Sequence, residues 1–367
     1  MVEEAGRVVA DRLQKLEALR SGGIEPYAYR YEVTHSTIAA RALFEAAETS
    51  QQLDEAGEAG PVRLGGRLVS LRSHGRTLFA DLADRDGRIQ LYFRSKDLGE
   101  RFSLLDHLDI GDWLGVEGRV FRTRMGEVTV KVSGFELLAK SVRPLPFGKE
   151  EVDADTGERR VHHGFTDIEQ RYRQRYADLA VHREVREVFV LRAKVVRWLR
   201  HFLDERGFLE VETPVLQPLY GGAAARPFVT HHNALDMPLY LRIADELYLK
   251  RLLVGGLERV YEIGHDFRNE GMDRTHNPEF TMLEFYQAYA DYGDMMALTE
   301  AMVAGVVEHC LGTRSLQRYG TTLDFTPPFR RVSFIEGIRE RAGLDLRTAS
   351  DQEMRRVLLG RVEPAEA

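Results

Sequence analysis

Hydrophobic residues follow two different periods along this chain. Between residues 62 and 138, short apolar–polar alternations are separated by turn signals such as Asp86-Gly87 and Met125-Gly126, which predicts strands. From about residue 185, apolar residues recur at helical spacing as far as residue 205, where Gly207 supplies a C-cap. The change of period predicts an N-terminal β-rich part and a C-terminal part that mixes helices and strands.

Five alternating runs make up the β-rich part, and a helical stretch, LGERFSLLDHL, follows the third. This order predicts an OB-fold β-barrel, a layout that several other small barrels share. A helix with apolar residues at helical spacing precedes it and ends at Gly22-Gly23. Packing on its own domain and direct RNA binding are equally open roles for that helix.

The C-terminal part contains a predicted hairpin over residues 259–292, after a predicted strand, FLEVETPVL, that Pro214 ends. Its second strand begins near Glu279 and alternates with a period of two. One face carries Phe280, Met282, Glu284 and Tyr286, a poor set for a core but a suitable pocket floor. The aromatic ring can stack on a flat ring and the carboxylate can bind a cation. Arg268, at the end of the first strand, can offer a planar fork to a phosphate.

Composition narrows the class of protein. The chain has 367 residues, 43% of them hydrophobic and 30% charged, which describes a soluble globular protein long enough for two domains. We find no apolar run of about 18 residues and no secretory signal, so we expect no membrane span. The single cysteine, Cys310, favours a reducing compartment. A net charge of −7 argues against wholesale coating of nucleic acid but allows a specific RNA partner.

Specific runs of sequence now point to a family. The run FRNEG followed by HNPEFTMLEFYQAYADY resembles motif 2 of the class II aminoacyl-tRNA synthetases, and its wording is similar to lysyl-tRNA synthetases. RYRQRYADL (residues 171–179) matches a run typical of the same family, and the helix, glycine, strand and proline over residues 185–216 resemble motif 1, its dimer interface.

The resemblance implies an α+β multidomain fold: an N-terminal OB-fold β-barrel followed by a class II antiparallel sheet flanked by helices. We expect an N-terminal helical extension over residues 1–60, the anticodon-binding barrel over 61–143, a linker over 144–178 and the catalytic domain over 179–367. The linker is polar around residues 148–170, and DADTG is a candidate hairpin tip. His162-His163 lack a cysteine partner, so we interpret them as surface residues rather than a metal site.

The resemblance also implies roles for individual residues. Arg268 would be catalytic, clamping the α-phosphate of ATP and the substrate carboxylate. The ATP-binding residues would be Arg268, Glu270, His276, Asn277 and Phe280, and the lysine-binding residues would be Gly222, Glu246, Glu284 and Tyr286. The anticodon-binding residues would be Arg72, Phe79, Gln90 and Glu127. From spacing alone, Phe79 would instead be a barrel-core residue, and GGAAA (residues 221–225) would be an ordinary small-residue loop.

The implied function is lysine–tRNA ligation in the cytoplasm: ATP and Mg²⁺ activate L-lysine, and a homodimer transfers it to tRNA(Lys). A non-catalytic tRNA-binding or regulatory module is one alternative. An aspartyl- or asparaginyl-type class II synthetase is another, although an aspartate pocket would want cations where this chain offers Glu284 and Tyr286.

Two departures from the family pattern stand out. His265-Asp266 precede FRNEG where relatives often carry arginine, and we expect only a modest local effect. No stretch after Tyr292 resembles motif 3, the glycine-rich run whose arginine binds the γ-phosphate and which acidic, magnesium-holding residues precede. We therefore expect the catalytic domain to be truncated, its metal ligands to be absent, and adenylate formation by this chain alone to be slow.

Overall fold

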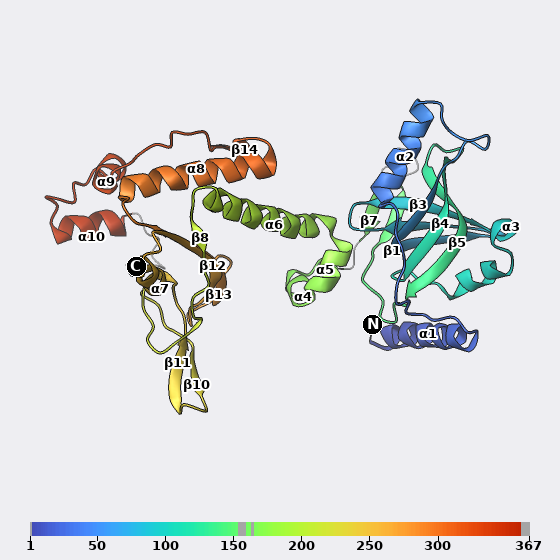
Figure 1. Ribbon diagram of the computed structural model, residues 1–367, viewed down its shortest axis with the longest axis horizontal. Helices are drawn as coiled ribbons and strands as arrows, with labels where there is room; N and C mark the ends of the chain where they lie inside the picture. Colours follow the sequence, from blue (N-terminus) through green and yellow to red (C-terminus); the bar gives the residue numbers. More distant parts are fainter. Residues whose placement is uncertain (1, 153–158, 163–164, 361–367) are drawn as a thin grey trace. The chain divides into compact units, whose positions relative to one another are not determined.

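The computed structural model describes residues 2–152, 159–162 and 165–360. Contacts divide the chain into two compact units, Met1–Arg186 and Glu187–Ala367, and each is described by itself. Figure 1 shows the elements of both.

A closed five-stranded barrel forms the centre of the first unit, with strand order β1-β2-β3-β5-β4 (Figure 1). Its strands are β1 (Ala59–His74), β2 (Thr77–Ala83), β3 (Arg88–Arg94), β4 (Trp113–Arg122) and β5 (Val128–Ala139). The helix α3 (Ser95–Leu98) and the 3-10 helix η1 (Gly99–His107) connect β3 to β4. Alternate residues of every strand, among them Leu64, Leu82 and Leu91, fill the barrel interior. The predicted OB fold, including its helical connection, is confirmed.

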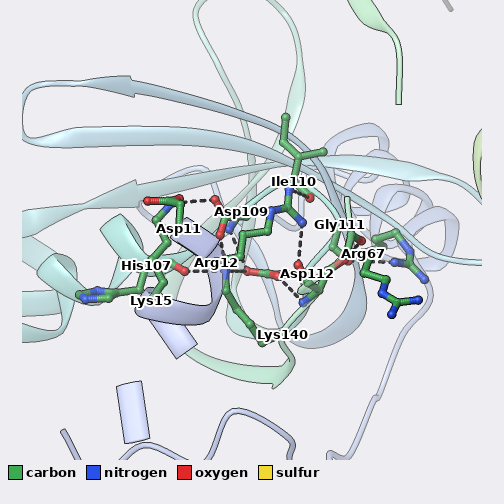
Figure 2. A network of polar contacts seen from close by, with 12 residues as sticks. Asp11, Arg12, Lys15, Arg67, His107, Asp109, Ile110, Gly111, Asp112 and Lys140 are labelled. Atoms are coloured by element: carbon green, nitrogen blue, oxygen red, sulfur yellow. Dashed lines mark hydrogen bonds and ion pairs between the residues drawn. The ribbon is translucent and has the colours of Figure 1, made fainter. Parts of the chain in front are cut away.

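Two helices pack on the barrel. The predicted first helix is α1 (Val2–Ser21). Its Arg12 donates hydrogen bonds to the carbonyl oxygens of Ile110 (2.9 Å) and Ser141 (2.6 Å), and its Lys15 donates to Asp109 (2.8 Å) (Figure 2). A second helix, α2 (Thr37–Thr49), buries Ala40 and Phe44 against the barrel after an N-cap at Ser36, and the sequence analysis did not single it out.

The same network holds a buried ion pair beneath α1. Lys140 at the end of β5 is fully buried and donates to Asp112, also fully buried, at 2.8 Å (Figure 2). It also contacts Asp109, so both carboxylates are paired. Because a buried charge is costly when unpaired, this network fixes α1 to the barrel next to the start of β4.

The segment between the barrel and the second unit is only partly described. β6 (Lys149–Val152) and β7 (Arg159–His162) pair as an antiparallel hairpin, and α4 (Ile168–Arg173) and α5 (Arg175–Val181) follow. The proposed hairpin tip, DADTG, and His163 lie outside the described residues.

A small sheet covered by two helices forms the core of the second unit. The helix α6 (Arg183–Asp204) runs into it, and α8 (Tyr292–Leu311) packs beside α6, with Trp198 of α6 filling the space over Gly305 of α8 (Figure 1). The sheet has the order β13-β12-β8, from β13 (Glu279–Gln287), β12 (Arg259–Phe267) and β8 (Leu209–Glu210). Phe202, Leu203, Tyr261 and Met302 are buried between helices and sheet.

The predicted strand FLEVETPVL is wrong in extent. Only Leu209 and Glu210 pair with β12, in parallel, and the Val211 amide adds one bond to the Tyr261 carbonyl. The Thr213 amide donates to the Glu262 carboxylate and Pro214 has no amide hydrogen, so no further ladder forms here.

The remaining elements surround this sheet. A second small sheet has the order β10-β11-β9, and a hairpin and two helices follow α8. Their bounds are β9 (Leu216–Gln217), β10 (Val229–His232), β11 (Met237–Leu241), α7 (Glu246–Val254), β14 (Ser315–Arg318), β15 (Thr321–Asp324), α9 (Phe334–Ala342) and α10 (Asp351–Leu359). Across the described ranges, every helix is too short or too polar to cross a bilayer.

Candidate functional site

The hairpin β12–β13 has two faces, of which one packs against helices and the other forms the floor of the candidate pocket. Its antiparallel register pairs Val260 with Tyr286 and Asp266 with Phe280. Leu283 and Phe285 face the helices α6 and α8 and join the core. Phe280, Met282, Glu284 and Tyr286 therefore share the opposite, half-buried face, as the period of two predicts.

Arg268 lies at the loop end of this hairpin. Its amide donates to the Pro278 carbonyl (2.8 Å), which fixes the backbone where the strand ends. Its guanidinium lies 5.1 Å from the centre of the Phe280 ring, and its Nε donates to the Ile243 carbonyl at 3.4 Å. A delocalised cation over an aromatic face leaves further N–H groups available for an anion.

The loop between the strands is exposed and held by its own side chains. Asp273 accepts from the backbone amides of Thr275 and His276, both at 2.7 Å, and contacts the His276 ring (2.8 Å). These bonds hold the pKa of Asp273 well below its usual range. Asn277 donates to the Glu279 carbonyl (2.7 Å), and Glu270 is exposed. The loop thus presents Glu270, His276 and Asn277 to solvent beside Arg268.

The helix α7 begins against a glycine loop. Glu246 opens the helix and pairs with Lys250 (2.6 Å) one turn later. Gly222 has a φ of +89°, and a Cβ there would lie 3.0 Å from the Glu246 Cβ. A side chain at this position would be both strained and crowded, so glycine lets the loop approach the helix start closely.

Glu284 and Tyr286 lie together on the pocket face, with further carboxylates nearby. The Tyr286 hydroxyl donates to Glu284 at 3.1 Å, and the amide of Asp245 also donates to that carboxylate. Burial raises the pKa of Glu284 despite those bonds, and Asp266 and Glu246 raise it further. Burial and the neighbouring Glu284 also raise the pKa of Tyr286. A cation entering this pocket would relieve the repulsion among these groups.

A buried ionic cluster behind the floor was not predicted. Arg242 follows β11 and crosses β12 over Gly264, donating to Glu262 (2.6 Å) and to the His265 carbonyl (2.9 Å). Asp245 and Asp266 face the same guanidinium at 2.9 and 3.3 Å. Burial, followed by Asp266 and Glu262, raises the pKa of Asp245 to about 8. Burial also raises the pKa of Asp266.

The barrel presents a ladder of aromatic rings on its outer face. Phe79 stacks on Tyr92 with ring centres 4.7 Å apart, and Phe121 lies 6.0 Å beyond Tyr92. All three rings are half-buried, whereas the neighbours Leu78 and Ala80 point into the core. The structure therefore excludes the barrel-core reading of Phe79.

The polar anticodon candidates lie around this ladder. Arg72 pairs across the strands with Phe79 and donates to Asp81 (3.2 Å). Gln90 accepts from Thr129 (3.0 Å) on the neighbouring strand. Burial alone would raise the pKa of Asp81, but hydrogen bonds from Arg88 and Ser70 outweigh it and lower that pKa. Glu127 lies at the β4–β5 turn and contacts Arg41 of α2 at 3.5 Å.

Comparison with known proteins decides the family. The model of class II tRNA synthetases (D, K and N) matches residues 167–361, and that of the OB-fold nucleic acid binding domain matches residues 62–138. A lysine–tRNA ligase of Moorella thermoacetica is 52% identical over 99% of this chain and 71% of its own length. Those of Carboxydothermus hydrogenoformans and Clostridium botulinum are 50% and 48% identical, each over 95% of this chain and over 67% and 65% of their own lengths. The chain belongs to the class II lysine–tRNA ligase family.

As a member of the lysine–tRNA ligase family, the chain spans roughly two thirds of its relatives, between 63% and 71% of their length. The two strands and loop recognised from motif 2 form one face with Arg268, Phe280, Glu284 and Tyr286, and α7 brings Glu246 to it. Arg242 and Asp245 escaped sequence analysis because their partners are distant along the chain. Asp266 was noticed only as a departure from the family pattern.

Metal ligands are a separate question. Among the residues that the structure describes, no group of three or more His, Cys, Asp and Glu side chains is placed to hold a metal ion. The described residues therefore do not fit a resident metal.

Proposed function

We propose that this chain acts in lysine–tRNA ligation, the cytoplasmic reaction that activates L-lysine with ATP and transfers it to tRNA(Lys). The observation that carries the proposal is the anionic pocket face: Glu284 with Tyr286, and Glu246 nearby, next to Arg268 stacked over Phe280. A pocket face with the half-buried carboxylate of Glu284, and with Glu246 nearby, fits an amino acid with an ammonium side chain. It rejects neutral amino acids because its carboxylates would be left unpaired.

The nucleotide would lie at the loop end of the hairpin. Phe280 would stack under adenine, and Arg268 would hold the α-phosphate and the lysine carboxylate in line for attack. In-line displacement at phosphorus depends on positioning and charge neutralisation, which a fixed guanidinium supplies. Glu270, His276 and Asn277 on the exposed loop would contact the nucleotide or the acceptor end of the tRNA. Mg²⁺ would arrive as the counter-ion of the ATP phosphates.

The amino acid would lie deeper on the same face. Its ammonium side chain would contact Glu284 and the Tyr286 hydroxyl, and its α-amino group would meet Glu246 beside Gly222. The raised pKa of Glu284 supports this assignment, because a bound cation would favour the ionised carboxylate.

The barrel would read the anticodon. Phe79 would stack on a base, and Arg72, Gln90 and Glu127 would contact base edges or backbone around it. The half-exposed ring ladder on an OB barrel supports this role, since such folds bind single strands by stacking. The proposed domains are the N-terminal extension over residues 1–60, the barrel over 61–143, the linker over 144–178 and the catalytic domain over 179–367.

The test is lysine-dependent ATP–pyrophosphate exchange, on this chain and on the chain extended to the length of its relatives. We expect exchange with L-lysine, and not with aspartate or asparagine, in the extended chain and at most slow exchange in this one. Exchange driven by aspartate would overturn the lysine assignment. Absence of exchange from both chains, together with tight binding of tRNA(Lys), would favour a non-catalytic tRNA-binding protein.

We also propose a homodimer through α6 and the residues after it. Val188, Phe189 and Val190 on α6 are each about half or more exposed, at 63%, 48% and 51%, and Leu209 and Leu216 follow with 52% and 48%. Exposed apolar side chains along these neighbouring segments support an interface. Sedimentation equilibrium is expected to give a dimer, and Phe189→Asp a monomer. Val254→Asp, at an exposed apolar position at the end of α7, is the matched control and is expected to stay dimeric. A monomeric unsubstituted chain would contradict the proposal.

A further inference from the structure

The cluster around Arg242 contains more buried negative charge than its single guanidinium can neutralise. Glu262, Asp245 and Asp266 lie within 2.6 to 3.3 Å of Arg242. Asp245 and Asp266 are completely buried. With all three carboxylates ionised, the cluster would carry a net charge of −2 away from water, which buried ion pairs do not tolerate.

Hydrogen bonding separates Glu262 from the other two carboxylates. Glu262 accepts from Arg242 and from both the amide (3.2 Å) and hydroxyl (2.7 Å) of Thr213. Arg242 also donates to the His265 carbonyl through Nε and to the Thr213 carbonyl and hydroxyl oxygens through Nη1. All four carboxyl oxygens of Asp245 and Asp266 lack a hydrogen-bond donor among the described residues.

The two aspartates face the same Arg242 guanidinium, and a side-chain hydrogen bond from Asp245 acts to lower the pKa of Asp266, which burial raises overall. Two carboxylates have no donor between them, whereas a carboxylic acid and a carboxylate share one hydrogen bond. Asp245 is also the N-cap residue of α7, where an aspartate normally accepts from the helix amides, and here its side chain makes no such bond. Its carboxyl group is therefore committed to Asp266 and Arg242.

This pair lies directly behind the pocket face. The Asp245 amide donates to Glu284, and Asp266 is close enough to raise the pKa of Glu284. Glu284 acts on Asp245 in the same sense. The charged groups that act on the pair include Arg242 at the end of β11, Glu262 on β12, Arg268 after β12 and Glu284 on β13, and Glu246 at the start of α7 acts on Glu284.

From this arrangement we propose that Asp245 and Asp266 share one proton in the free protein and release it to solvent when an ammonium side chain binds beside Glu284. The pair is thus a specificity-determining element. When a cationic ligand binds, both aspartates become ionised behind the pocket, and when a neutral ligand binds they keep the shared proton. The identity of the cation rests on the proposed lysine function. The shared proton rests on the cluster alone.

The shared proton is tested first, on the free chain labelled with ¹³C at the aspartate carboxyl carbon. We expect an aspartate resonance that titrates with a midpoint near the pKa of about 8 that burial imposes on Asp245. Asp245→Asn and Asp266→Asn each remove that titration, and Asp236→Asn, at an exposed site, leaves it. If every aspartate carboxyl titrates below pH 6, the inference is overturned whether or not lysine binds.

Proton release is tested by calorimetric titration with L-lysine at pH 7.5 in two buffers of different ionisation enthalpy. We expect release of a large fraction of one proton from the unsubstituted chain and almost none from the Asp245→Asn/Asp266→Asn double variant. Norleucine, which has no ammonium side chain, is expected to cause none. Equal release from the double variant overturns the inference. A carboxyl titration near pH 8 without any lysine binding overturns the proposed function and leaves the shared proton supported.

Discussion

At the scale of single residues, the pocket face consists of side chains whose charge matters more than their volume. Glu284 is half-buried and accepts from Tyr286 and from the Asp245 amide, so it is oriented before a ligand arrives. A pre-oriented carboxylate loses little entropy when it binds a cation. The charge of Glu284, and not its shape, should therefore decide lysine affinity.

Replacing Glu284 with glutamine tests this point because the amide keeps the volume and removes the charge. We expect the KM for lysine in pyrophosphate exchange to rise about 10- to 100-fold, the range for loss of one charged hydrogen bond. Tyr286→Phe should have a smaller effect in the same direction. Glu308→Gln on α8, which removes a surface pair with Arg314, is the control and should leave KM unchanged. An unchanged KM in Glu284→Gln would remove Glu284 from the lysine site.

On the barrel, the corresponding residue is Phe79, whose ring stacks on Tyr92 and is only half-buried. Phe79→Ala should weaken binding of tRNA(Lys) about 5- to 100-fold, the effect of losing one stacked base. Filter binding with tRNA(Lys) measures it. Tyr29→Ala removes a fully exposed ring elsewhere and should bind as the unsubstituted chain does. Equal losses in both variants would mean that Phe79 has no special role.

At the scale of elements, Gly264 on β12 allows the buried cluster to form. A Cβ at this position would lie 1.9 Å from Nη2 of Arg242. Gly264→Ala should displace that guanidinium, leave Glu262 buried without its partner, and lower the free energy of unfolding by roughly 3 kcal/mol or more. Chemical denaturation of the second unit measures the loss. Gly271→Ala, in open space on the loop after β12, is the matched control and should change stability little.

Sequence reasoning predicted elements best where the pattern is local. The barrel strands and the hairpin alternate with a period of two, and α6 carries its apolar stripe, so each could be located without knowledge of its partners. The strand after Gly207 was overestimated because the Thr213 amide donates to the side chain of Glu262 instead of to a strand carbonyl, a contact between distant residues. The helix α2 was missed although Ser36 is a good N-cap and Ala40 and Phe44 share a face.

The spacing of residues alone could group candidate site residues only where one segment carries them, and the resemblance to the family supplied those on other segments. Arg268, Phe280, Glu284 and Tyr286 lie on one hairpin, so its period places them together. Arg242 meets Glu262 and Asp266 from another strand, and no pattern within residues 237–246 indicates those contacts. The register of β12 with β13 and the crossing of Arg242 over Gly264 depend on contacts between residues that are separated in the sequence.

At the scale of the whole molecule, the two units should respond to pH in opposite ways. In the barrel, Lys140 and Lys15 outweigh the effect of burial and lower the pKa of Asp109. A carboxyl group whose pKa is lower in the folded protein stabilises the fold at pH values above its pKa in the unfolded chain. This stabilisation is lost as pH falls below about 4. In the second unit, burial raises the pKa of Asp245 to about 8. Its contribution is full below about pH 4 and declines as pH rises through 8.

Between pH 5 and 8, therefore, the barrel should keep a constant stability while the second unit loses up to about 1.4 kcal/mol per pH unit. Scanning calorimetry over this range should show one transition that stays in place and one that moves to lower temperature. Asp245→Asn should flatten the second. A barrel transition that moves with pH, or a second transition that does not, would contradict these assignments.

The contacts of α1 also set an order of events during synthesis. Arg12 binds the carbonyl oxygen of Ser141, 129 residues later, and Lys15 binds Asp109, 94 residues later. The ribosome therefore releases this helix long before its docking surface exists. The helix can dock on the barrel only after β5 and Ser141 have emerged, and until then its basic side chains are available to other acidic partners.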